Sequence, residues 1–203
     1  MGKNRAIIFS MYTHSLVRRL TKNALMLALL CVVGMFSIPL GDNIKVSLQL
    51  LIVMIICLSA DGVVDCIIVT GCYLGLGLFA PVYAGFSSGI SPTFGFVISF
   101  VVASPVYYFM NKLPIRFSIL RMAIACLTGL IVVYAIGAVF LMLYLNLEFG
   151  KSLMISVVPY IPFDLIKIAL AIAVIQAIPD SVLHPGKKKA KIEDSANDEE
   201  PHE

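Results

Sequence analysis

The stretch that decides the fold is Pro159-Tyr160-Ile161-Pro162-Phe163-Asp164-Leu165-Ile166-Lys167, which places one acidic and one basic side chain at the start of a long apolar run. Most remaining residues up to Ile178 are apolar, and a run of this length is typical of a membrane-spanning helix. Because Asp164 and Lys167 are three residues apart, a helix brings their side chains onto one face and within reach of each other.

Ionisable side chains inside a span are costly, at about 2.5–3.5 kcal/mol each on insertion scales, and usually face a bundle interior or a polar cavity. We interpret the pair as a ligand site in which the Asp164 carboxylate accepts hydrogen bonds and the Lys167 ammonium group donates them. The alternative is a self-neutralising ion pair that only ties helices together.

The composition around this stretch predicts a membrane protein. Of the 203 residues, 60% are hydrophobic and 13% are charged, whereas soluble domains are about 45–50% apolar and about 25% charged. We predict an all-α integral membrane protein with six transmembrane helices, or five if residues 46–79 divide differently. The predicted spans are Leu20–Ile38, Val46–Ala60, Gly62–Phe79, Thr93–Met110, Ile119–Leu147 and Ile155–Ile178.

The basic residues predict the orientation. With six spans, twelve of the fifteen Lys and Arg residues fall on one side of the membrane, and the excess of basic residues marks the cytoplasmic side. Both termini are therefore expected in the cytoplasm. We predict a basic N-terminal segment (1–19), a six-helix transmembrane domain (20–180) and a disordered charged tail (181–203), which has too little apolar surface to fold alone.

One outward connection, Phe79–Phe96, is uncharged and dense in Gly, Pro, Ser and aromatic residues. Glycines permit a close approach of the main chain to a ligand, and aromatic rings such as Tyr83 and Phe86 would form apolar walls. We predict that this loop closes over a bound solute, with Gly85 and Ser87 also at the site. The alternative is an ordinary turn with interfacial aromatic residues.

Two further positions are candidates for contacts. Gln49 lies just inside the second span, where its amide needs a partner, and that partner is either a ligand or another helix. Ala24 and Ala28 in the first span have the small-xxx-small spacing that lets helices approach closely. They are candidate partner-binding residues, although the same spacing also fits a lipid-facing position.

The sequence offers little for catalysis. It has no HExxH motif and no P-loop, and its histidines (His14, His184 and His202) lie outside the predicted spans. The five cysteines lie within apolar runs and lack metal-ligand spacing. We therefore predict no enzyme activity, no cofactor and no metal site. If ATP drives transport, a partner must hydrolyse it.

Several segments together resemble the BioY family, the biotin-binding substrate (S) components of energy-coupling factor (ECF) transporters. The resemblance covers about residues 20–178. Its most specific parts are the Gly-Phe-Ser-Ser-Gly…Pro-Thr-x-Gly-Phe loop (85–96) and the Pro-Phe-Asp-x-x-Lys entry (162–167), and it extends to Ala24–Ala28 and Ile44–Leu51.

The resemblance implies a six-helix S component in a prokaryotic plasma membrane that binds biotin from outside with high affinity. Its implied partners are a transmembrane coupling subunit and two ABC-type ATPases, within the lipid bilayer and with no role for nucleic acid. Asp164 and Lys167 match the family's vitamin-contacting positions, and Ala24 and Ala28 match the face toward the coupling subunit.

Three alternatives stay open at this stage. The segment Gly89–Pro92 is shorter than is usual in the family, which leaves room for an S component of the same fold that binds a different vitamin. A solitary membrane carrier or channel that needs no ATPase is the second alternative, and a membrane enzyme without the common catalytic motifs is the least supported.

Overall fold

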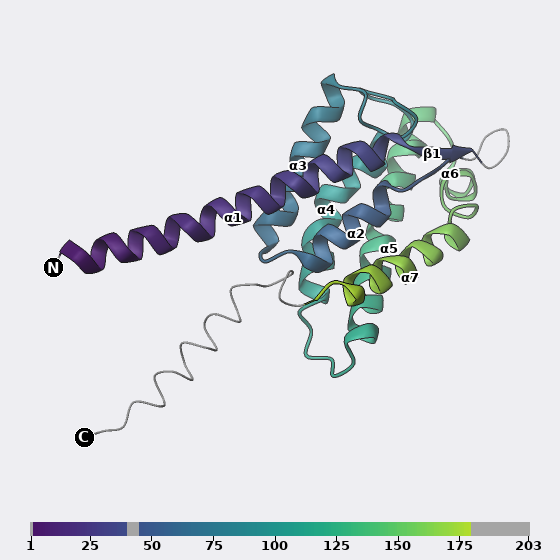
Figure 1. The fold of residues 1–203 in the computed structure, drawn as a ribbon. Coiled ribbons are helices and arrows are strands. Elements are labelled where there is room, and N and C mark those ends of the chain that lie inside the picture. The colour runs from purple at the N-terminus through teal and green to yellow at the C-terminus, as the bar shows by residue number, and fades with distance from the viewer. Residues whose placement is uncertain (1, 40–44, 180–203) are drawn as a thin grey trace.

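A computed structural model describes residues 2–39 and 45–179 of the chain and shows a bundle of helices with one short hairpin (Figure 1). The prediction of an all-α fold is confirmed in its main feature. The elements are α1 (Gly2–Met35), β1 (Ser37–Pro39), β2 (Lys45–Ser47), α2 (Gln49–Ser59), α3 (Val63–Phe79), α4 (Phe94–Met110), α5 (Ser118–Leu145), α6 (Phe149–Ser156) and α7 (Ile161–Ala177).

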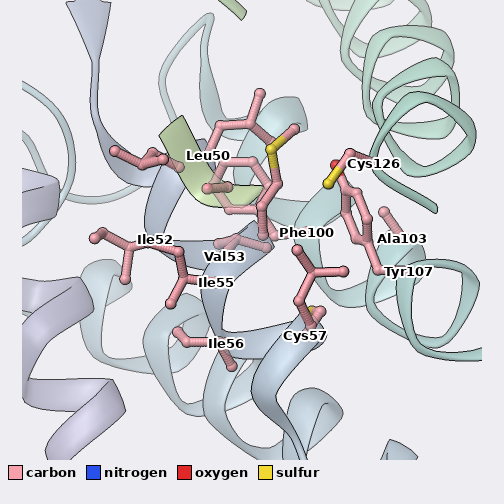
Figure 2. Close-up of a cluster of buried hydrophobic side chains, with 14 of the residues drawn as sticks. Leu50, Ile52, Val53, Ile55, Ile56, Cys57, Phe100, Ala103, Tyr107 and Cys126 are labelled. Atoms are coloured by element: carbon pink, nitrogen blue, oxygen red, sulfur yellow. The ribbon is translucent and has the colours of Figure 1, made fainter. Parts of the chain in front are cut away.

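Helix α2 is the centre of the bundle. All eleven of its residues are buried, and it packs against α1, α4 and α7. Figure 2 shows its side chains Leu50, Val53 and Cys57 among those of α4 and α5. A helix that is apolar on every side is expected to be surrounded by other helices, and α2 meets that expectation.

Helices α4 and α5 interlock through aromatic rings that lie directly on glycines. A Cβ at any of these glycines would overlap the ring that faces it, so only glycine leaves room for the ring. Small residues at helix interfaces let the helices approach closely, and inside a membrane that van der Waals packing drives association. The pairs are Phe140 on Gly95, Tyr107 on Gly129 and Phe96 on Gly137.

The first predicted span, Leu20–Ile38, was extended too far at its outer end. The helix ends at Met35, and residues 37–39 form β1, which pairs antiparallel with β2 in the register Ser37↔Ser47, Ile38↔Val46 and Pro39↔Lys45. Ile38 and Val46 are β-branched and favour a strand, and Pro39 has no N–H with which to continue a helix.

The last predicted span, Ile155–Ile178, is not one helix. It is broken at residues 157–160 into α6 and α7, whose axes are bent by 52°. Pro159 lies in the break, and Pro162 lies in the first turn of α7, where its missing N–H is tolerated. Helix α6 also occupies most of the predicted outward connection 148–154.

Within residues 2–39 and 45–179, α5 alone is long and apolar enough to cross a membrane as a single helix. The bent pair α6–α7 meets the same criterion when its two helices are taken together. Helices α2, α3 and α4 are apolar and 11–17 residues long.

Successive helices run in opposite directions, with α6 and α7 taken together as the last (Figure 1). One end of the bundle, the loop end, holds the hairpin, the loop 80–93, α6 and the start of α7. The opposite end, the link end, holds the connections 60–62 and 111–117. Because α2, α4 and α7 start at the loop end, their first residues share one half of the molecule.

Candidate functional site

The Asp164–Lys167 pair lies in the first two turns of α7, on the side that packs against α2 and α5. Asp164 is 3% exposed and Lys167 is 7% exposed. Lys167 Nζ donates to Asp164 Oδ1 at 2.6 Å. The contact predicted from their spacing is present, and their role toward a ligand stays a prediction.

Tyr134 of α5 joins this pair from the facing helix. Its hydroxyl donates to Asp164 Oδ2 at 2.6 Å, so each oxygen of the carboxylate accepts one charge-assisted hydrogen bond. The sequence reasoning missed Tyr134 because it lies among apolar residues of a long helix, with no spacing that relates it to Asp164. We define Asp164, Lys167 and Tyr134 as the polar triad.

The Lys167 ammonium group has three donors. In the part of the chain that the structure describes, Asp164 Oδ1 is its one recorded acceptor. A buried charge is costly unless it is paired and hydrogen-bonded, so the remaining donors of Lys167 favour an acceptor from outside the chain.

Gln49 starts α2 at the loop end and is buried. Its side-chain amide donates to the hydroxyl of Tyr73 on α3, and that hydroxyl donates to the carbonyl of Val82 at 2.8 Å. The structure therefore places Gln49 in contact with another helix, which is one of the two predicted alternatives, and links it through Tyr73 to the loop 80–93.

Tyr83 is 2% exposed, and its ring lies against Gly77 of α3. Its hydroxyl donates to the carbonyl of Leu74 at 2.7 Å, and its ring contacts those of Tyr73 and Phe94. Tyr83 therefore anchors the loop to the bundle, and in this structure it is a packed side chain.

Phe86, by contrast, is 61% exposed, and its ring makes an edge contact with Phe36 after the end of α1. Its backbone is left-handed, with φ of 58°, a conformation that is uncommon for residues other than glycine. The loop thus holds Phe86 outward at its tip.

Gly85 and Ser87 flank Phe86 and fix the turn. Gly85 has φ of 73°, which glycine adopts without strain, and its N–H donates to the carbonyl of Met35 at 2.9 Å. Ser87 pairs with Tyr83 through the backbone, and its hydroxyl donates to the carbonyl of Ala84 at 3.0 Å. The loop is a compact turn fastened to α1 and α3.

The candidate residues form two clusters at the same end of the bundle. Within residues 2–39 and 45–179, no hydrogen bond, ion pair or aromatic ring contact joins the triad directly to Gln49 or the loop. Helix α5 connects them, because Phe140 contacts Phe94, which in turn contacts Tyr83. Phe140 comes six positions after Tyr134, an offset of about 9 Å along a helix. The rings of Phe94 and Phe140 therefore connect α5 to the loop.

Ala24 and Ala28 are both exposed on α1. The same helix is fastened to the link end by three neighbouring side chains. Arg19 donates to Asp65 at 2.6 Å, Asn23 donates to Asp65 at 2.9 Å, and Lys22 donates to the carbonyl of Ser59 at 2.7 Å. The hydrogen bond and the charge of Asp65 raise the pKa of Arg19 above its ordinary value. These contacts fix how α1 is turned against the bundle, and therefore the direction in which Ala24 and Ala28 face.

The residues that the structure describes contain no group of three or more His, Cys, Asp or Glu side chains that would hold a metal ion. Among the described residues, the charged side chains that are buried at the loop end are those of Asp164 and Lys167. The chemistry available there is hydrogen bonding to a polar solute.

Several known proteins are similar to this chain in sequence or in fold. A biotin transporter BioY from Thermotoga maritima is 31% identical over 163 residues, which cover 76% of this chain and 92% of that protein. A probable biotin transporter BioY from Pyrococcus horikoshii is 31% identical over 102 residues, covering 48% of this chain and 57% of the relative.

A solved structure, the S-component for biotin from an ECF-type ABC transporter, superposes with a TM-score of 0.70 at 28% identity. The superposition covers 79% of this chain and 90% of that one. The BioY family model matches residues 4–184 of the 203 residues. The chain therefore belongs to the BioY family.

Proposed function

We propose that this chain is a high-affinity biotin-binding membrane subunit that mediates biotin uptake together with an ATP-hydrolysing energy-coupling module. The observation that carries the proposal is the buried Asp164–Lys167 pair, whose ammonium group keeps donors available for a ligand. Membership of the BioY family and the similarity to proteins named biotin transporters support it. Binding and transport, rather than catalysis, are the activity of such a subunit.

The chemistry of the triad fits the vitamin. The ureido group of biotin presents two N–H donors and one carbonyl acceptor, and the molecule ends in a carboxylate. The Asp164 carboxylate suits an N–H donor, and Lys167 suits the carbonyl or the carboxylate. The rings of Phe94 and Phe140 contact each other near the start of α4 and would supply apolar surface to a mostly apolar site with few polar anchors.

The proposed topology has six spans, formed by α1, α2, α3, α4, α5 and the bent pair α6–α7. Both termini then lie in the cytoplasm, with the loop end outside, in a multi-pass arrangement in the plasma membrane of a prokaryote. The alternating helix directions support this arrangement (Figure 1). So does the presence of Arg19, Lys112 and Arg121 at the link end, since basic residues favour the cytoplasmic side.

The proposed division of the chain keeps a basic cytoplasmic segment (1–19), a transmembrane domain (20–180) and a charged cytoplasmic tail (181–203). In the structure α1 runs through residues 2–35, so the basic segment is continuous with the first helix of the bundle. The tail lies outside the described residues.

Two further parts of the proposal concern the loop and the partner. The loop 80–93 acts as a lid over biotin, in which Tyr83, Gly85, Phe86 and Ser87 take part. The exposed Ala24–Ala28 face of α1 contacts the transmembrane coupling subunit, which works with two ABC-type ATPases. Small side chains on an exposed face permit the close approach of a partner helix.

Mass spectrometry of the small molecules released from purified, unfolded protein tests the proposed ligand. We expect about one biotin per protein, because tight binding survives purification in detergent. Release of another vitamin would replace biotin as the substrate while keeping the transport class. If protein purified from biotin-supplemented cells released no vitamin, high-affinity binding would be refuted.

A further inference from the structure

Asp65, in the first turn of α3, accepts a hydrogen bond on each of its two carboxylate oxygens, and both donors come from α1. Arg19 Nη2 donates to Oδ2 at 2.6 Å, and Asn23 Nδ2 donates to Oδ1 at 2.9 Å. Because Asp65 is buried, these bonds also offset the cost of burying its charge. Gly62 leaves room for the ion pair, since a Cβ there would lie 3.0 Å from Arg19 Nη2 and 3.3 Å from Asp65 Oδ2.

These two bonds hold one rotation of α1. Arg19 and Asn23 are four residues apart, so they are neighbours on one face of the helix. Turning the helix about its axis would move both donors away from the carboxylate together. Lys22 adds a third bond from α1, to the carbonyl of Ser59 at the end of α2, at 2.7 Å. Helix α1 therefore meets α2 and α3 at the link end through a defined polar face.

The rotation of α1 decides which side chains a partner helix meets. At 3.6 residues per turn, Ala24 and Ala28 lie on average about 140° around the helix from the two donors to Asp65. Leu20 and Leu25 flank the alanines on either side and are exposed. If α1 turned, one of these leucines would face the partner in place of an alanine and prevent the close approach that small residues permit.

We propose that Asp65 is a positioning residue for uptake, which turns α1 so that Ala24 and Ala28 face the coupling subunit. The inference rests on the proposed function and adds a residue to it. Asp65 lies at the link end, whereas Asp164 and Lys167 lie at the loop end. Loss of the Asp65 contacts should therefore lower uptake and leave biotin affinity unchanged.

The test is the Asn23→Asp variant, which puts a second carboxylate where the amide now donates to Asp65. Like charges at this distance repel each other. We expect biotin uptake into vesicles that contain the coupling module to fall about tenfold, a size within the range found for residues in direct contact. Calorimetry should give the biotin affinity of the parent, and less of the coupling module should copurify with the variant.

A second substitution should reverse the effect. In Asn23→Asp/Asp65→Asn the donor and acceptor of the bond are exchanged without a change of shape, and the new amide oxygen still accepts from Arg19. We expect most of the uptake to return. Asp61→Asn is the matched control, because Asp61 pairs with Lys22 at 3.1 Å in an exposed salt bridge, which contributes little. Its uptake should equal that of the parent.

Normal uptake by Asn23→Asp would overturn the inference, and so would the absence of recovery in the exchanged pair. Equal losses of biotin affinity and uptake would assign the contact to folding instead of positioning. Arg19→Ala, which removes only the ion pair, should show the same split between binding and uptake if Asn23→Asp does not fold, and normal uptake there would also overturn the inference. Failure of the proposed function gives a different result, since the parent protein would then not bind biotin at all.

Discussion

At the scale of single residues, the Asp164 carboxylate is held by two donors from two helices. Lys167 and Tyr134 each donate at 2.6 Å, one to each oxygen. Together they offset the cost of burying a negative charge and fix the direction in which the carboxylate faces. A ligand that meets this arrangement finds an acceptor and an ammonium group already in place.

Tyr134→Phe keeps the ring and removes one of these donors. Hydrogen bonds to charged groups contribute about 1.5–3 kcal/mol, so we expect a comparable loss of stability and weaker binding of biotin. Thermal unfolding in detergent and titration calorimetry measure the two effects. Tyr144→Phe on the same helix is the control, because that tyrosine is exposed and should tolerate the change. Equal behaviour of the two variants would contradict a role for Tyr134.

The sequence predicted the Asp164–Lys167 contact because a helix fixes side chains three residues apart on one face. It did not predict Tyr134, because the position of Tyr134 relative to Asp164 depends on how α5 packs against α7. It also could not show that Tyr83 is packed on Gly77 while Phe86 is exposed, since both look alike as loop aromatics. Helical periodicity predicts which residues are neighbours within one helix. Which residues of different helices are neighbours depends on how the helices pack.

At the scale of elements, the loop 80–93 is held to α3 by Tyr83 on Gly77. Gly77→Ala places a methyl group in the Tyr83 ring, so we expect the loop to detach, with a loss of stability and of biotin affinity. Gly75→Ala on the same helix meets nothing within 4 Å, so it should be neutral or stabilise the helix by up to about 1 kcal/mol. Thermal unfolding and biotin titration of both variants test this. If Gly77→Ala matched Gly75→Ala, the anchoring role of Tyr83 would be wrong.

The lid hypothesis predicts that the tip of this loop becomes protected when biotin binds. Ser88 is exposed beside Phe86, and Ser88→Cys in a Cys72→Ala background gives a single labelling site on the loop. We expect alkylation by a membrane-impermeant reagent to slow at saturating biotin. Lys151→Cys, exposed on α6 at the same end, should react at the same rate with and without biotin. An unchanged rate at Ser88→Cys would make the loop an ordinary turn.

The errors at element scale have a common cause. Judged by apolar content alone, Ile155–Ile178 was predicted to be one span, and the first span was predicted to reach Ile38. The prolines at 159 and 162 break the last span, since a proline removes a backbone donor and clashes with the preceding turn. Pro39 and the pairing of Ile38 with Val46 end the helix of the first span before Ile38. Hydropathy located the apolar helices, and local backbone chemistry decided where they end or bend.

At the scale of the whole molecule, α1 has one side that is bonded to the bundle and one that is exposed. Arg19 and Asn23 fasten the helix to Asp65 at the link end, whereas Ala24 and Ala28 are exposed. This placement disfavours the view that the alanines pack inside the bundle, and it leaves a partner helix or lipid as their neighbour.

The double variant Ala24→Trp/Ala28→Trp enlarges this face and leaves the polar triad untouched. We expect unchanged biotin affinity but lost uptake, because a partner helix can no longer approach closely. Calorimetry and uptake into vesicles that contain the coupling module measure both on the same variant. Val102→Trp on α4, also exposed, is the control for bulk added at a lipid-facing position. Normal uptake by the double variant would leave the alanines lipid-facing.

The most direct test of the whole account is calorimetric titration of biotin into purified protein and its Lys167→Ala variant. Truncating one partner of a buried charge pair costs about 2–5 kcal/mol, so we predict at least roughly a thirtyfold loss of affinity. Asp164→Asn should lose affinity too, and Lys151→Ala, which removes an exposed charge on α6, should match the parent. Tight binding of biotin to a folded Lys167→Ala variant would contradict the assignment of the site.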